Sequence, residues 1–305
     1  MTIGMADQLS LDAMPVRLYP VTPTKLANWS DCPRKFRFTY LQRLPKGGPW
    51  AHSTMGGAVH NALKQWWDVP LSRRTPQRAA GLVHEAWVDE GFRDRDQSAQ
   101  WRQRASEMVA GYVTGIDPER EPLGIERTVG VPVMSMALSG RVDRIDELPS
   151  ETDGREGASV VDYKTGRTML SRDDVRGSAA LALYAVAVAR TLRRSCTQVE
   201  LHHLPSGQVH TWNHTQESLA RQVKRANDVA IEAQRAHETW RAGLDVHATR
   251  VGQTANGVIA DPEVDAVLPP KPSVLCGWCD FRRWCPEGRA AAPAKQPWDG
   301  LATDE

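Results

Sequence analysis

The sequence predicts an α/β protein in which helices flank a central mixed β-sheet. Apolar residues recur at helical spacing along Met55–Trp67 and Ala99–Val113, whereas valines alternate with other residues in Gly124–Leu138, as on a strand. A second strand-like stretch, Val160–Gly166, begins with apolar residues. Helical and strand periodicities thus both occur in this chain of 305 residues, which is long enough for one large domain.

The first part of the chain is predicted to be helical. Thr22–Pro23 and Thr75–Pro76 are each typical of an N-cap followed by a proline at the first helical position. The helix that starts at Thr22 carries Leu26 and Trp29 on an apolar face, and Cys32–Pro33 ends it. The helix that starts at Thr75 and the helix over Ala99–Val113 contain no recognisable chemistry, and we expect them to pack around the sheet.

The second half of the chain predicts helices around a hairpin. Asp173–Arg194 has the pattern of a long amphipathic helix, and Gln198–Leu204 with Gly207–Trp212 predicts a β-hairpin. A further long helix is expected from Gln216 to Ala242, ended by the following glycine. Residues 244–275 contain several prolines and are expected to be irregular.

Composition indicates an ordinary globular protein: 41% of residues are hydrophobic and 25% are charged. No apolar run approaches the ~20 residues of a membrane span, and no secretory signal is evident, so we expect a cytoplasmic protein without membrane association. The net charge of +1 neither demands nor excludes nucleic acid. The chain lacks a Walker motif, so any helicase motor would belong to a separate partner.

Two strand-like stretches bring acidic and basic side chains together. Ser139–Asp146 presents Asp143, and the stretch at Val160 delivers Asp162 and Lys164, whose i and i+2 spacing puts them on one face of a strand. Residues 148–159 between them predict a hairpin loop. Two carboxylates and a lysine on adjoining strands suit a hard divalent cation that holds a phosphate oxygen and a water.

These residues resemble the PD-(D/E)XK nuclease superfamily, and more narrowly its RecB-like exonuclease branch. Gly140-x-x-Asp143 followed by Asp162-Tyr-Lys164-Thr-Gly166 matches the family patterns in family order. An isolated Asp-x-Lys would more often be a surface ion pair. The resemblance implies a restriction-endonuclease-like core and metal-dependent hydrolysis of phosphodiester bonds in DNA repair or recombination. The expected substrate is single-stranded DNA or a frayed end.

The resemblance extends to a histidine and a tyrosine. Gly56–His60 resembles the family's G-x-x-h-H motif, which implies that His60, Asp143 and Asp162 hold Mg²⁺ or Mn²⁺ together with the Tyr163 carbonyl. Lys164 would then orient or activate the attacking water. In the family's Q-x-x-x-Y motif, Tyr184 matches the tyrosine, whereas Ala180 replaces the glutamine. Tyr184 is therefore either an active-site residue or part of the core.

A basic segment near the N-terminus is a candidate DNA-binding surface. Residues 32–67 contain no Asp or Glu, and aromatic residues are interleaved with the cations. The alternative is a solvated basic helix, and the aromatic residues are better explained as core. The residues expected to bind DNA are Arg34, Lys35, Arg37 and Arg43.

Four of the five cysteines form a pattern that suits a metal centre. Cys276-x₂-Cys279-x₅-Cys285 lies near one end of the chain, Cys32 lies near the other, and Cys196 stands outside the pattern. Four thiolates bind either zinc or an iron–sulphur cluster, and zinc is the commoner structural ion. The one-plus-three layout, however, resembles iron–sulphur nucleases of the AddB type and the CRISPR-associated adaptation exonucleases. This resemblance implies a [4Fe–4S] cluster that clasps the two ends of the nuclease core, with Zn²⁺ as the alternative.

We therefore expect a mobile lead-in over residues 1–20, a nuclease domain over 21–286 and a disordered tail over 287–305. Two alternatives from other functional classes stay open. One is a catalytically weak DNA-binding or scaffold subunit of a repair complex, which the alanine at position 180 favours and the intact Asp143, Asp162 and Lys164 oppose. The other is a zinc-stabilised DNA-binding protein without metal-dependent chemistry.

Overall fold

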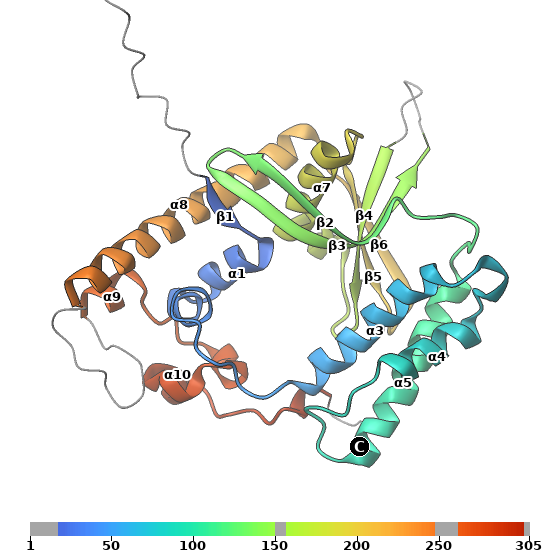
Figure 1. Cartoon of the computed structure of the whole chain (residues 1–305), viewed down its shortest axis with the longest axis horizontal. Coiled ribbons are helices and arrows are strands. Elements are labelled where there is room, and N and C mark those ends of the chain that lie inside the picture. The colour runs from blue at the N-terminus through green and yellow to red at the C-terminus, as the bar shows by residue number, and fades with distance from the viewer. Residues whose placement is uncertain (1–17, 150–156, 248–261, 302–305) are drawn as a thin grey trace, which may run out of the picture.

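The protein is described here from a computed structural model, which covers residues 18–149, 157–247 and 262–301 (Figure 1). It has a six-stranded sheet in which β1, β3, β4, β5 and β6 follow one another and β2 pairs with β3. The predicted fold class, a central mixed sheet flanked by helices, is confirmed. The strands are β1 (Tyr19–Val21), β2 (Gly124–Val133), β3 (Met136–Leu148), β4 (Gly157–Lys164), β5 (Gln198–His203) and β6 (Gln208–Asn213).

The strand β3 exchanges one neighbour for another along the same edge. Its start, Met136–Leu138, pairs in parallel with β1, and its end, Arg144–Leu148, pairs antiparallel with β4. The opposite edge is occupied by β2 along most of its length. β3 and β4 therefore diverge beyond the pair Arg144–Val161, and a fork opens between them.

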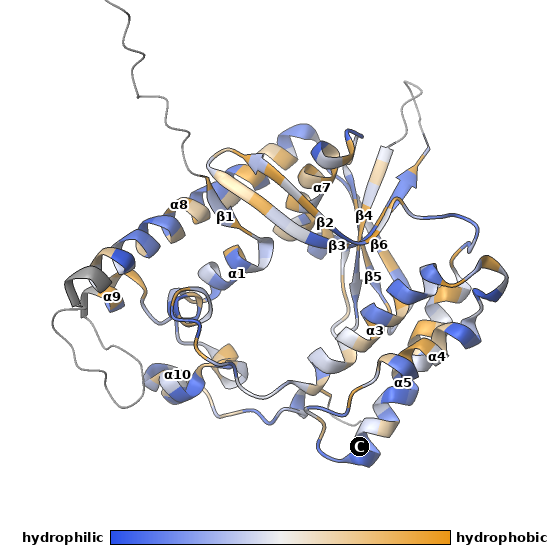
Figure 2. Ribbon diagram, in the orientation of Figure 1, coloured by the Kyte–Doolittle hydropathy of each residue, from blue (hydrophilic) through white to orange (hydrophobic). Residues whose placement is uncertain are grey.

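Helices cover both faces of the sheet (Figure 1). One core joins the sheet to α1, α7 and α8, and the other packs α3, α4 and α5 against Val161 and Tyr163 of β4. Figure 2 shows hydrophilic and hydrophobic residues in alternating patches along α8, which buries one side only. The helices are α1 (Pro23–Asp31), α2 (Pro33–Phe36), a π-helix (Arg37–Leu41), α3 (Ala51–Asp68), α4 (Pro76–Ala86), α5 (Arg95–Thr114), α6 (Arg172–Gly177), α7 (Ala179–Leu192), α8 (Gln216–His247), α9 (Pro262–Val267) and α10 (Pro286–Ala291), with short 3₁₀ segments at Leu71–Arg73, Val274–Trp278, Arg282–Trp284 and Asp299–Leu301.

The predicted N-caps at Thr22 and Thr75 are confirmed, because each hydroxyl accepts a hydrogen bond from the third residue of its helix. The predicted helix over 173–194 is wrong in one respect, since it breaks at Ser178, whose side chain caps α7. α8 continues past Gly243, and α9 lies within the stretch expected to be irregular. Among the described helices, none combines the length and apolar composition that crossing a bilayer requires.

The hairpin formed by β2 and the start of β3 was not predicted from the sequence. The stretch 124–138, predicted as a continuous strand, turns at Met134–Ser135 and forms β2 and the start of β3. The valines of β2 stand at odd positions and Met136 and Leu138 at even positions, yet all face the same core, so the apolar alternation shifts by one residue at the turn. Met134 adopts the left-handed backbone at φ 52°, where glycine would be the usual signal.

Both ends of the chain are more ordered than expected. Tyr19 and Pro20, placed in the mobile lead-in, belong to β1. The tail from residue 287, predicted to be disordered, contributes α10, and its 3₁₀ turn at Asp299–Leu301 packs against α3. The Pro297 carbonyl also accepts a hydrogen bond from the Ala51 amide at 3.0 Å. Residues 1–17, 302–305 and most of the predicted 148–159 loop lie outside the described residues.

Buried ion pairs join the two ends of the chain. Arg34 contacts Asp265 at 3.2 Å and Glu287 at 2.6 Å, and Arg37 contacts Asp265 at 2.7 Å. Only 8% of the Arg34 side chain and 2% of the Arg37 side chain are exposed. The expectation that these two arginines bind DNA is therefore corrected: their guanidinium groups are internal and engage acids, since a buried charge requires a partner.

Substitution of Asp265 tests this junction. Asp265→Asn removes the charge that two buried guanidinium groups share, so we expect the free energy of unfolding to fall by roughly 1.5–3 kcal/mol, the range for hydrogen bonds to charged groups. Denaturant unfolding measures the change. Asp228→Asn is the control because its pair with Lys224 is exposed, and it should cost less than about 0.5 kcal/mol. Equal effects of the two substitutions would contradict the assignment.

Candidate active site

The fork between β3 and β4 gathers side chains from three elements. His60 comes from α3, Glu126 from β2 and Asp143 from β3, and one ligand atom of each lies within 4.8 Å of the others. His60 Nδ1 is 3.5 Å from an Asp143 oxygen and 3.6 Å from a Glu126 oxygen. Within the described residues, no other group of three His, Cys, Asp or Glu side chains is this compact.

Strand register brings Asp162 and Lys164 to the same place. The last β3–β4 pair is Arg144–Val161, so the next position places Asp143 opposite Asp162. The Tyr163 amide donates a hydrogen bond to Asp143 Oδ2 at 2.9 Å. Lys164 Nζ lies 2.5 Å from Asp162 Oδ2. The structure thus brings together the predicted site residues His60, Asp143, Asp162 and Lys164.

Glu126 was not predicted from the sequence. The β2–β3 register would pair it with Asp143, but this pair is skipped between Ile125–Arg144 and Arg127–Val142. Its position could have been found only by locating the turn at Met134, which fixes the register of the hairpin. That turn carries no glycine, proline or asparagine, and the sequence marks it only by Ser135 and by the one-residue shift of the apolar alternation between Val133 and Met136.

The backbone is distorted where Glu126 faces Asp143. Glu126 has φ 45°, a left-handed conformation that typically costs 1–3 kcal/mol in a residue other than glycine. The alternation of β3 is interrupted at the same place. Val142 and Ile145 both face the core beneath α7, although they are three residues apart. The distortion turns both carboxylates toward His60, and strain of this kind is common where a binding site over-determines the backbone.

The electrostatics favour a cation between these carboxylates. Burial lowers the pKa of His60. Hydrogen bonds to Asp143 and Glu126, together with the negative charges of these two residues, outweigh the effect of burial and raise the pKa to about 10. Burial raises the pKa of Asp162, and the Asp143 charge adds to this while Lys164 opposes it. In the metal-free protein an imidazolium therefore lies where a metal ion would otherwise balance the carboxylates.

The donor set fits a hard divalent cation. Carboxylate oxygens are the preferred ligands of Mg²⁺ and Mn²⁺, and a neutral imidazole suits Mn²⁺. His60, Glu126 and Asp143 supply such atoms within one small volume, with Asp162 on the adjoining strand. The residues present therefore fit a divalent metal site.

Tyr184 of α7 faces the fork. A Cβ atom on Gly140 would lie 2.4 Å from the Tyr184 ring, so only glycine at position 140 allows this ring its place. Burial raises the pKa of Tyr184, and the charges of Asp162 and Asp143 raise it further. The ring thus lies beside the carboxylates, although it is also packed against the core.

Residues 20–286 match the family model of the PD-(D/E)XK nuclease superfamily. The chain belongs to this superfamily. The predicted superfamily is confirmed, and it implies metal-dependent nuclease activity with DNA as the substrate. No curated protein matches the sequence.

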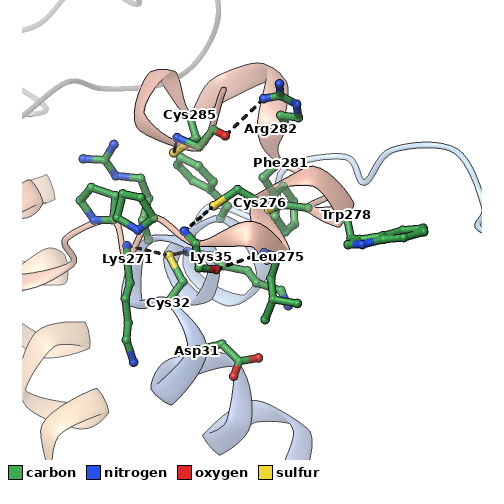
Figure 3. A pocket seen from close by; sticks show the side chains of 17 residues that line it. Asp31, Cys32, Lys35, Lys271, Leu275, Cys276, Trp278, Phe281, Arg282 and Cys285 are labelled. Carbon is green, nitrogen blue, oxygen red and sulfur yellow. Dashed lines mark hydrogen bonds between the residues drawn. The ribbon is translucent and has the colours of Figure 1, made fainter. Parts of the chain in front are cut away.

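The four cysteines that were predicted to bind a metal centre line one cavity of about 190 Å³. Figure 3 shows Cys32, from the N-terminal part, beside Cys276 and Cys285 from the C-terminal part. Cys279 lines the same cavity, as do Lys35, Lys271 and Arg282. Cys196 is instead buried in the main core, where desolvation raises its pKa to about 12.

Backbone amides point at these thiols. Lys35 and Lys271 amides lie 3.5 and 3.4 Å from the Cys32 sulphur, and the Ser273 amide lies 3.4 Å from Cys276. The Gly288 amide is 3.3 Å from the Cys285 sulphur, and the Phe281 backbone hydrogen-bonds Cys279. No three of the four sulphurs lie within 4.8 Å of one another. The thiols therefore converge on a cavity without forming a single-ion cage.

The raised pKa of His60 predicts proton release on metal binding. A ligating imidazole must be neutral, so a metal that binds at pH 8 should displace a proton from His60. Calorimetry in two buffers of different ionisation enthalpy should show more protons released per Mn²⁺ by the native protein than by His60→Gln. An equal number would contradict the assignment.

The raised pKa of His60 also makes the stability of the metal-free protein depend on pH. Because the folded pKa lies above 6.5, the charge on His60 stabilises the fold fully below about pH 6.5, and this contribution is lost as the pH rises through about 10.

Proposed function

We propose that this protein is a Mg²⁺- or Mn²⁺-dependent exonuclease that hydrolyses phosphodiester bonds at single-stranded or frayed DNA ends. A place in DNA repair or recombination beside a separate helicase is part of the same proposal. The observation that carries it is the fork, where Asp143 and Asp162 diverge next to His60, Glu126 and Lys164. A carboxylate pair with an adjacent lysine is the chemistry that metal-assisted phosphodiester hydrolysis needs.

Each residue of the site has a separate role in this reaction. His60, Glu126, Asp143 and Asp162, with the Tyr163 carbonyl, would hold the metal, which would polarise a phosphate oxygen and acidify a water. Asp162 fixes the Lys164 ammonium at 2.5 Å, and from there the ammonium orients the attacking water and balances charge that develops on the phosphate. The Tyr184 ring, held against Gly140, closes the side of the site formed by α7.

Contacts to DNA outside the fork are assigned to fewer residues than the sequence suggested. Lys35 is half-buried at the cysteine cavity, and Arg43 is exposed after the π-helix. Both remain proposed DNA contacts, since residues 32–67 contain no acid that would repel a phosphate. Arg34 and Arg37 are left out because they bind Asp265 and Glu287.

Cleavage assays test the proposed activity. Asp162→Ala and Lys164→Ala should each lower Mn²⁺-dependent cleavage of labelled single-stranded DNA by about 10²-fold or more, with DNA binding retained. Lys224→Ala, an exposed change on α8, is the charge control. Cleavage at the native rate in either site variant would contradict the mechanism. A native protein that binds DNA without cleaving it would support the scaffold alternative.

The preference for ends has its own test. An exonuclease should degrade linear single-stranded DNA and leave circular single-stranded DNA of the same sequence intact. Equal loss of both substrates would show an endonuclease and would overturn the exonuclease part of the proposal.

We also propose that Cys32, Cys276, Cys279 and Cys285 hold a [4Fe–4S] cluster. They line one cavity, and amide hydrogen bonds to the sulphurs are a feature that tunes such clusters. A single zinc ion at ~2.3 Å from each sulphur would require all four sulphurs roughly 4 Å apart, whereas no three of them lie within 4.8 Å of one another. A cluster spaces its thiolates more widely because each binds a different iron atom.

Metal content across single cysteine variants tests the cluster. Cys32→Ser should behave like Cys279→Ser, with loss of iron, of visible absorbance and of thermal stability, because both are proposed as ligands of one centre. Cys196→Ser should keep its iron. Iron and zinc per chain are measured after anaerobic purification. Stoichiometric zinc without iron in the native protein would contradict the cluster.

A further inference from the structure

Arg141 lies between Gly140 and Asp143, at a position that the family motif leaves open, and the mechanism above does not use it. It lies on β3 between Gly140 and Val142, and 70% of its side chain is exposed. Its Nε lies 2.7 Å from Glu126 Oε2, while the other Glu126 oxygen faces His60 Nδ1 at 3.6 Å. The guanidinium is thus held at the rim of the candidate metal site by one of its carboxylates.

We propose that Arg141 is a substrate-binding residue that contacts a backbone phosphate of the DNA at the fork, and that Glu126 holds it until a cation occupies the site. This inference rests on the proposed function. The two Glu126 oxygens face two different partners, the Arg141 guanidinium and the His60 ring. Once a metal ion occupies the Glu126 carboxylate, the attraction that holds Arg141 weakens, and the exposed guanidinium is free to turn outward.

The charges around the fork favour this role. Glu126, Asp143 and Asp162 repel an approaching phosphate, and the Lys164 ammonium, which the mechanism uses at the reacting phosphate, is also paired with Asp162. Arg141 supplies a second cation at the same site. A guanidinium offers a planar pair of donors that binds phosphate oxygens bidentately, which a lysine cannot do.

A purely structural role explains the position less well. Glu126 lies diagonally across from Arg141, whose direct partner in the sheet is Thr128. An ion pair with so exposed a partner contributes about 0–1 kcal/mol. That is less than the ordinary cost of the left-handed backbone at Glu126, so the pair does not account for the distortion. The arrangement is better explained by the ligands that it prepares to bind.

Salt-dependent DNA binding tests the proposal. With Ca²⁺ replacing the catalytic metal, Arg141→Gln should weaken binding of a fluorescent single-stranded oligonucleotide roughly tenfold. It should also lower the slope of log affinity against log salt by about 0.7, the loss of one phosphate contact. In EDTA, where Glu126 keeps Arg141, the variant should match the native protein. Arg141→Lys should recover part of the affinity.

Arg221→Gln on α8 is the matched control for net charge, and it should leave the slope unchanged. Equal slopes for native protein and Arg141→Gln in Ca²⁺ would overturn the proposal. A loss of the same size in EDTA would overturn the switching by Glu126.

Metal dependence separates substrate binding from metal binding. Arg141→Gln should lower kcat/KM about tenfold, whereas the Mn²⁺ concentration for half-maximal cleavage should stay equal or fall, since Glu126 loses a competing cation. A rise in the Mn²⁺ requirement with an unchanged salt slope would assign Arg141 to the metal site and refute its substrate role. If the native protein itself does not cleave DNA, the proposed function fails, while the binding experiment still decides the role of Arg141.

Discussion

The structure depends on the point where β3 exchanges β1 for β4. β3 pairs with β1 over Met136–Leu138 and with β4 over Arg144–Leu148, so the β3–β4 ladder stops at Arg144–Val161, and the next residues of the two strands are Asp143 and Asp162. Two carboxylates are thereby held close together without a ladder hydrogen bond between their strands. The amide of Tyr163, freed from that ladder, binds Asp143 instead. The α3 helix then adds His60, and the hairpin partner β2 adds Glu126.

The two ends of the chain form a second unit that depends on long-range contacts. β1 ties the N-terminal part to the sheet, and the Arg34 and Arg37 ion pairs tie it to α9 and α10. Phe38 packs against Phe281 beside the cysteine cavity. These contacts assemble the cavity from residues more than 240 positions apart, so the proposed cluster would reinforce a junction that the fold already forms.

The sequence predicted the features that depend on neighbouring residues, such as helix caps and residues on one strand face. It did not predict the features that depend on strand register or on partners far along the chain. Asp162 and Lys164 were predictable because i and i+2 residues share a strand face, and Thr22 and Thr75 because a cap acts within one turn. Glu126 was not, since its place requires a turn that lacks glycine, proline and asparagine. Arg34 and Arg37 were assigned to DNA because their acidic partners lie 253 and 228 residues along the chain.

The central claim is that the fork forms one divalent metal site with Glu126 as a ligand. Electron paramagnetic resonance of Mn²⁺ titrated into the protein measures this without any substrate. We expect one tight Mn²⁺ per chain in the native protein, no tight binding in Asp143→Asn, and affinity at least tenfold lower in Glu126→Gln. Native affinity in Glu126→Gln, or the absence of a tight site in the native protein, would contradict the account.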